Sequence, residues 1–354
     1  MDLTRHGVRD WLPLALVEAY RFTRAKYGHM RFLLRLNREL RRSNRAQKGL
    51  ALPPWASTSG SGPMTVLFFP EYPEGRDTAK NLCARLGYAT TTNPDDPWDV
   101  VLKWHDATYF DPATLDRLPA GVPVINRESV DISKTTVDQA MERVFGYSAR
   151  IDPTQYRGLA VEKSDLNGMH DGRVVRCPLP KESLRSGRVY QRLVDSTFTP
   201  GIVTSFRVPI HGRRIPVVYL WYRPVEQRFG SGSQNRRWRV GGRPHFLDPH
   251  DAFSTDELTN IMAFTRHIGL DFGALDILRD NGDGRIYIVD ANNTPVGPPR
   301  RIPRSVRWIV HARLSRSFDE MLREFRRAPV DARGNLELSG VGHKSGPSRP
   351  DATA

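Results

Sequence analysis

The sequence has only two cysteines among its 354 residues, Cys83 and Cys177. Two cysteines cannot form a disulfide framework or a four-cysteine zinc site. This scarcity excludes the small, disulfide-stapled class of protein. With 39% hydrophobic residues, the chain can instead bury a sizeable apolar core.

A long apolar run is missing as well. The longest uncharged apolar stretch near the N-terminus, residues 11–17, is far shorter than the roughly 20 residues that cross a bilayer. Asp10 and Glu18 flank this stretch, whereas a secretory signal has a separate basic region before its apolar part. We therefore expect neither a membrane span nor a signal peptide, and a cytoplasmic location.

Acidic residues are too few to balance the basic ones, and the formal net charge is +14. Residues 1–50 hold twelve Lys and Arg against four acids, and residues 300–327 hold nine Arg against three acids. These two segments account for the whole excess, so the rest of the chain is neutral. A nucleic-acid groove is usually basic across the domain and interleaved with aromatic residues, so we do not expect nucleic-acid binding.

The composition divides the chain into six parts. Residues 1–48 predict a basic amphipathic helical segment, which can lie on an anionic membrane surface, contact a partner protein or cover its own core. Residues 49–63, rich in Pro, Gly and Ser, predict a linker. We then expect a small wound α/β subdomain at 64–132, a second subdomain at 133–200, a third at 201–328 with a basic C-terminal helix, and a disordered tail at 329–354.

The most informative stretch holds two acids within otherwise apolar strands at 272–278 and 285–292. Pairing these strands symmetrically about the turn at Gly282 predicts that Ile288 lies opposite Asp276. Asp290 is then the diagonal neighbour of Asp276 on the same face, and Asn292 lies two residues further on that face. Two carboxylates and an amide oxygen suit Mg²⁺ or Mn²⁺.

The alternative for this hairpin is a solvent-facing edge with ordinary surface acids. In either case, we expect Asp280 and Asp283 in the turn to point to solvent.

Two further groups of residues contain charged side chains. A strand ending at Lys163 leads into a polar loop with Ser164, Asn167, Gly168 and His170, whose backbone amides can fold over phosphates. Arg207 and Arg223 lie on neighbouring predicted strands, where a guanidinium can grip a carboxylate or a phosphate. An ordinary polar hairpin and structural ion pairs are the respective alternatives.

The order of these pieces, from lysine and glycine loop through arginine strands to an acidic hairpin ending in Asp290-Ala-Asn292, resembles the ATP-grasp superfamily of ligases over roughly residues 64 to 300. The resemblance implies an α/β (α+β) ATP-grasp fold, in which 133–200 and 201–328 are the two subdomains that hold ATP. The family's metal motif carries Glu where this chain has Asp290. The resemblance also implies site residues. These are Lys134, Lys163, Ser164, Asn167, Gly168, His170, Gln191, Arg192, Leu193 and Asp195 for ATP, Asp276, Asp290 and Asn292 for the metal, and Arg207 and Arg223 for catalysis.

The resemblance thus implies an ATP- and Mg²⁺-dependent ligase that activates a small-molecule or peptide carboxylate as an acylphosphate for attack by an amine or a thiol. A kinase on the same fold is the second hypothesis. A non-catalytic nucleotide-binding protein at a membrane surface or in a scaffold is the third. The sequence names neither the carboxylate nor the nucleophile.

Overall fold

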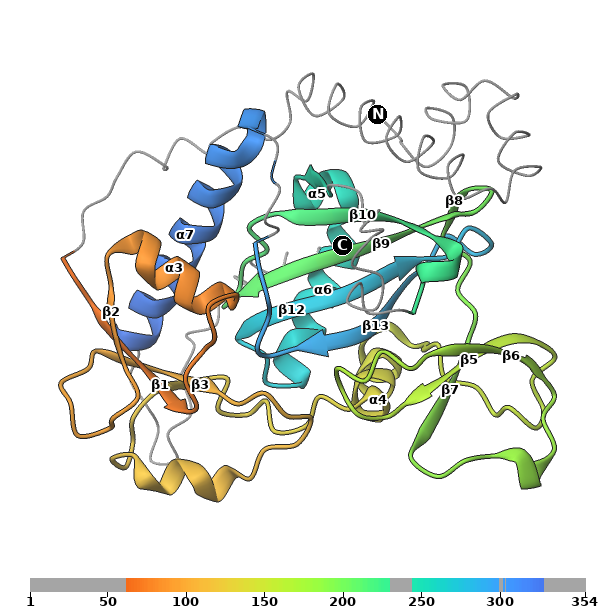
Figure 1. The fold of residues 1–354 in the computed structure, drawn as a ribbon, viewed down its shortest axis with the longest axis horizontal. Coiled ribbons are helices and arrows are strands. Elements are labelled where there is room, and N and C mark those ends of the chain that lie inside the picture. The colour runs from red at the N-terminus through yellow and green to blue at the C-terminus, as the bar shows by residue number, and fades with distance from the viewer. Residues whose placement is uncertain (1–61, 230–243, 299–301, 303, 328–354) are drawn as a thin grey trace, which may run out of the picture.

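The computed structural model describes residues 62–229, 244–298, 302 and 304–327. The basic segment 1–48, most of the linker 49–63 and the tail 329–354 lie outside the described residues, and so do the predictions made for them. The described chain is mixed α/β, with one parallel and two antiparallel sheets, as the sequence predicts (Figure 1).

A four-stranded parallel sheet forms the N-terminal part, in the order β2-β1-β3-β4. Its strands are β1 (Thr65–Pro70), β2 (Ala89–Thr91), β3 (Val100–Trp104) and β4 (Val124–Ile125). Helix α3 (Thr78–Leu86) ends at Gly87, whose φ of 71° lies in the left-handed region that glycine adopts without strain. On the opposite face lies the 3-10 helix η3 (Pro112–Arg117).

A three-stranded antiparallel sheet follows, in the order β6-β5-β7. It consists of β5 (Gly158–Ser164), β6 (Arg173–Cys177) and β7 (Arg188–Arg192). The helix before it, α4 (Lys134–Phe145), begins where predicted, because the Ser133 hydroxyl accepts a hydrogen bond from the Thr136 backbone N–H. This cap fixes Lys134 at the first position of the helix.

The largest sheet has six strands, with β11-β10-β9-β12-β13 in order and β8 paired to β9. The strands are β8 (Thr197–Thr199), β9 (Ile202–His211), β10 (Val218–Pro224), β11 (His245–Leu247), β12 (Phe272–Arg279) and β13 (Ile286–Asn292). Helices α5 (Pro249–Ala252) and α6 (Thr255–His267) precede β12, and Ser254 with Glu257 forms a capping box at the start of α6. The basic helix α7 (Arg304–Arg327) closes the described chain.

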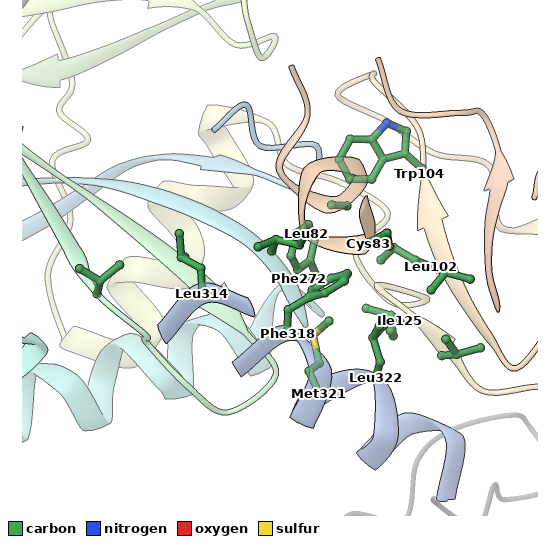
Figure 2. Packing of buried hydrophobic residues seen from close by; sticks show 14 of the residues in the cluster. Leu82, Cys83, Leu102, Trp104, Ile125, Phe272, Leu314, Phe318, Met321 and Leu322 are labelled. Carbon is green, nitrogen blue, oxygen red and sulfur yellow. The ribbon is translucent and has the colours of Figure 1, made fainter. Parts of the chain in front are cut away.

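The two faces of the large sheet pack against different partners. On one face, apolar residues of β9, β12 and β13 contact α4 and α6. On the other face, Phe272 of β12 and Phe318 of α7 join the core of the N-terminal sheet (Figure 2). The far end of this second face carries the candidate site.

No helix in the described ranges is long and apolar enough to cross a bilayer.

Asn126 joins the N-terminal sheet to strand β12. Its Oδ1 accepts hydrogen bonds from the backbone N–H groups of Asp271 and Phe272, both at 2.8 Å, and its Nδ2 donates to the Phe272 carbonyl at 2.7 Å. The side chain is fully buried, and the backbone has a φ of 66°. Asparagine is one of the few residues that adopt this left-handed conformation readily.

We expect the Asn126→Ala substitution to lower the free energy of unfolding by roughly 2–5 kcal/mol. The variant leaves buried backbone groups of Asp271 and Phe272 without partners and forces alanine into positive φ. Urea unfolding measures the loss. Asn93→Ala is the control, because Asn93 makes its hydrogen bonds in an exposed turn. Equal losses for the two variants would contradict the role of Asn126.

Candidate functional site

Asp276 and Asp290 lie directly opposite each other on β12 and β13. The predicted register is therefore wrong at this point, because Ile288 pairs with Ile277 and not with Asp276. Two shifts of one residue explain the difference. Near the turn, Arg279 pairs with Ile286, one residue away from the symmetric pairing, and a β-bulge between Ile277 and Asp276 adds one extra residue, Val289, to β13. Ile288 packs into the core with α4 and α6, whereas Asp290 and Asn292 face the same side as Asp276.

Each of the two acids has a cation from another element. Lys134 Nζ, at the start of α4, lies 2.8 Å from Asp290 Oδ1. Arg207 of β9 donates from Nη1 to both carboxylate oxygens of Asp276, at 3.1 Å each. The acids are partly buried, and they are not the free surface acids of the alternative interpretation.

Lys163 approaches the same place from the small sheet. Its Nζ donates to the carbonyl of the bulged residue Val289 at 2.9 Å. Burial lowers the pKa of this ammonium to about 8, against the raising effect of nearby Asp290, Asp138 and Asp276. The structure thus brings Lys134, Lys163, Asp276 and Asp290 together, as predicted.

The glycine loop after β5 contacts the acidic hairpin. Asn167 donates from Nδ2 to Asn292 Oδ1 at 3.3 Å, and its backbone N–H donates to Thr108 Oγ1 at 2.8 Å. Lys134 Nζ reaches Asn167 Oδ1 at 3.4 Å. Gly168 has a φ of 73°, which suits the tight turn of the loop.

The other predicted loop residues have different environments. Ser164 shapes the loop, because its backbone N–H donates to Asp171 Oδ1 and its hydroxyl accepts from the Leu166 N–H. His170 is exposed, and within the described residues its side chain makes no hydrogen bond or ion pair.

Four of the residues predicted to bind ATP lie at the end of β7 or just after it, and they make contacts away from the two acids. Gln191 donates from Nε2 to both oxygens of Asp138 on α4, at 2.9 and 2.8 Å. Arg192 forms ion pairs with Asp280 and Asp283 of the hairpin turn. Leu193 donates its backbone N–H to Leu159, and Asp195 accepts from the Thr197 N–H. A role for these four residues in binding ATP remains a prediction.

The expectation that Asp280 points to solvent is wrong. Its side chain is buried, pairs with Arg192 and accepts a hydrogen bond from the Gly282 N–H at 2.6 Å. Asp283 is partly exposed, and its Oδ2 accepts from Tyr287. The turn acids therefore attach the hairpin to β7.

Three residues near the site were missed from the sequence. Asp165 anchors the start of α4, because its carbonyl accepts from the Lys134 N–H and its Oδ1 accepts from the Thr135 N–H. Thr108 holds the glycine loop, and Asp138 holds Gln191. Burial raises the pKa of Asp138 to about 6. An acid at an inward position of an amphipathic helix was the available signal for Asp138.

The chemistry of the polar side chains on the hairpin decides which metal ion they can hold. The described residues contain no group of three or more His, Cys, Asp or Glu side chains that could hold a metal ion. Asp276, Asp290 and Asn292 instead offer two carboxylates and one amide oxygen on one face. Hard oxygen donors of this kind fit Mg²⁺, which keeps several ligands from water or phosphate.

A cavity of about 770 Å³ lies elsewhere, between α4 and β7. Arg150, Arg185 and Arg188 are among the residues that line it. Arg185 and Arg188 both pair with Glu162, which is buried on β5. The cavity contains none of the acids or lysines described above.

By sequence, the chain matches no family model and no curated protein. By structure, it is similar to a D-alanine–D-alanine ligase from Bacillus anthracis complexed with ATP, at 13% identity over 75% of this chain and 98% of that chain, with a TM-score of 0.48. It is also similar to a RiPP-associated ATP-grasp ligase from Chryseobacterium gregarium in complex with ADP and a leader and core peptide. The identity is 13% over 78% of this chain and 100% of that chain, with a TM-score of 0.42. A RimK domain ATP-grasp protein from Sphaerobacter thermophilus is 14% identical over 73% of this chain and 99% of that chain, with a TM-score of 0.43.

We expect the stability of the protein to depend on pH through Lys163. The pKa of Lys163 is about 8 in the folded chain and near 10.5 when unfolded, so between these values the unfolded state binds one more proton. The free energy of unfolding of the wild type, relative to Lys163→Met, should therefore rise by about 1.4 kcal/mol per pH unit from pH 8 to 10. Urea unfolding at several pH values measures this difference. Lys181→Met, at an exposed position, is the control, and a flat difference for Lys163→Met would contradict the burial of its charge.

Proposed function

We propose that the protein is an ATP- and Mg²⁺-dependent ligase that activates a carboxylate as an acylphosphate for attack by an amine or a thiol. The observation that carries the proposal is the convergence of two opposed acids, two lysines and a glycine loop at one end of the large sheet. These groups come from four separate stretches of the chain. Ion pairs that only stabilised the fold could form within one stretch, and they would not require these groups to meet at one place.

The two lysines are suited to hold the phosphates of a nucleotide. Both belong to ordered elements, since Lys134 begins a capped helix and Lys163 lies on the central strand of the small sheet. Their ammonium groups approach the acid pair from α4 and from β5. The loop around Asn167 and Gly168 lies beside them, because the Asn167 side chain contacts both Lys134 and Asn292.

Asp276, Asp290 and Asn292 are the residues that we propose to hold Mg²⁺. When bound, this ion neutralises charge on the β- and γ-phosphates during phosphoryl transfer. In the structure, Arg207 and Lys134 balance the charges of the two acids. We propose that both cations turn to the phosphates when nucleotide binds with its metal, so that one set of charge partners is exchanged for another.

The reaction needs no nucleophilic side chain. A carboxylate oxygen of the substrate attacks the γ-phosphorus, the bond to the ADP oxygen breaks, and ADP leaves. The amine or thiol then attacks the acyl carbon, and inorganic phosphate leaves. Arg207 is placed beside Asp276 to stabilise the negative charge of both steps. Cys83 and Cys177 are buried and take no part.

We expect Asp276→Asn and Asp290→Asn each to lower turnover by about 100-fold or more, a loss comparable to removing one strong charge-stabilising group. Each variant keeps the size of the side chain but removes one anionic ligand, so stabilisation by ATP·Mg²⁺ should disappear as well. Without nucleotide, the cost of Asp276→Asn should be at most about 1 kcal/mol, because Asp276 and Arg207 are both partly exposed. The cost of Asp290→Asn should be larger, because it leaves the buried Lys134 ammonium without its acid. Melting curves with and without ATP·Mg²⁺, together with ADP release, measure these effects.

Two control variants separate the site from general damage. Asp116→Asn removes an exposed acid of η3 and should change neither turnover nor the nucleotide-dependent shift. Asp280→Asn breaks a buried ion pair and should lower stability while the shift by ATP·Mg²⁺ persists. The metal assignment fails if Asp276→Asn or Asp290→Asn keeps its shift and turnover. A phosphorylated product without condensation would indicate a kinase, and no ADP release with any substrate would indicate a non-catalytic protein.

A further inference from the structure

Trp221 on β10 has an unusual indole nitrogen. Its Nε1 is shielded from solvent, and none of the residues that the structure describes accepts a hydrogen bond from it. A shielded donor without an acceptor costs roughly 1–3 kcal/mol, and such a group needs a specific explanation. The ring itself packs beside the core that Tyr219 and Phe246 share with α7.

The neighbour of Trp221 on the same face has the same deficit. Arg223 lies two residues further along β10, and successive alternate residues of a strand share one face. In the part of the chain that the structure describes, Arg223 forms no ion pair and no side-chain hydrogen bond. The nearby acid, Asp276, is already bound by Arg207. Two arginines against one carboxylate leave one positive charge in excess.

These donors are displaced from the place where phosphoryl transfer is proposed. Arg207 pairs across strands with Asp276 on one side and with Tyr219 on the other. The backbones of Trp221 and Arg223 therefore lie on the second strand from Asp276, about 10 Å away across the sheet and further along their strand, although the long Arg223 side chain extends near enough for its charge to interact with Asp276 and Arg207. A carboxylate that reacts beside Asp276 and Asp290 cannot also occupy the row formed by Trp221 and Arg223.

We propose that the row of Trp221 and Arg223 is a subsite for a second carboxylate of the substrate, which makes the substrate a diacid or a compound with an acidic side chain. The inference rests on the proposed ligase function, because that function places the first carboxylate. Two donors without acceptors, together with one excess positive charge, call for an anionic acceptor and not for an amine. A planar carboxylate can accept from the guanidinium and from the indole N–H together.

The subsite also provides specificity. A substrate with one carboxylate leaves the shielded indole N–H and the guanidinium without partners, which is the condition under which a site rejects an analogue most strongly. Binding of monoacids is therefore expected to be independent of Trp221.

The test follows the indole N–H of Trp221 in the full-length protein labelled with ¹⁵N-tryptophan. Straight-chain diacids from succinate to suberate are titrated in the presence of ATP·Mg²⁺. The resonance that is missing from Trp221→Phe identifies Trp221. We expect a diacid of matching length to shift this resonance, and we expect Trp221→Phe to raise the dissociation constant of that diacid about tenfold, the loss of one charge-assisted hydrogen bond. Arg223→Met should raise it further.

Matched controls accompany the titration. Trp98→Phe removes an indole N–H that donates to the Pro94 carbonyl, and should leave the dissociation constant unchanged. A monoacid of the same chain length should bind the wild type and Trp221→Phe equally.

The proposal is overturned if no diacid shifts the Trp221 resonance, or if Trp221→Phe and Arg223→Met both bind the diacid as the wild type does. The melting shift by ATP·Mg²⁺ is recorded on the same samples. A shift with nucleotide but no diacid effect overturns the subsite alone. A diacid effect without any nucleotide shift supports the subsite and overturns the ligase function.

Discussion

The bulge at Val289 is the local feature on which the candidate site depends. Without the extra residue, regular alternation would place Asp290 on the same face of β13 as Ile288, within the apolar core against α4 and α6. The bulge shifts the second half of the strand, so that Asp290 and Asn292 face the same side as Asp276. It also releases the Val289 carbonyl from the strand ladder, and this carbonyl accepts from Lys163. One inserted residue thus assembles the acids and attaches the small sheet to them.

The sequence predicted the elements of this site but not the bulge. Apolar periodicity, the Ser133 and Ser254 caps and Gly87 placed most helices and strands within a few residues, because these signals are local. Symmetric pairing about Gly282 failed because Arg279 pairs with Ile286 near the turn and because the bulge at Val289 adds a further shift of one residue. The inward position of Asp280 was missed because its partner, Arg192, lies 88 residues away in sequence. The strands β2, β8 and β11 were missed because three-residue strands carry too little periodicity. Asp276, Asp290 and Lys163 were found because charged residues inside apolar strands stand out.

The electrostatics of the site explain how two acids can be held in close opposition. Direct cross-strand pairing of two carboxylates is unfavourable, and it is tolerated here because Arg207 and Lys134 each neutralise one of them. Those cations come from β9 and from the capped start of α4, so the helix cap and the sheet register control the spacing of charge. Asn126 fixes β12 itself by binding Asp271 and Phe272, four to five residues before Asp276. The position of the acids therefore depends on three separate packing contacts.

The same face carries polar groups of two kinds. At β12 and β13, Asp276 and Asp290 each have a cation, and a ligand there must exchange partners. At β10, no described residue accepts from Trp221 Nε1 or from the Arg223 guanidinium, and the proposed diacid would supply an acceptor. The first arrangement suits a nucleotide that brings its own metal, since both charge signs are replaced together. The second suits a fixed anionic group that is bound but not transformed. The division between paired and unpaired groups on one sheet thus matches the proposed separation of a region for chemistry from a region for recognition of the substrate.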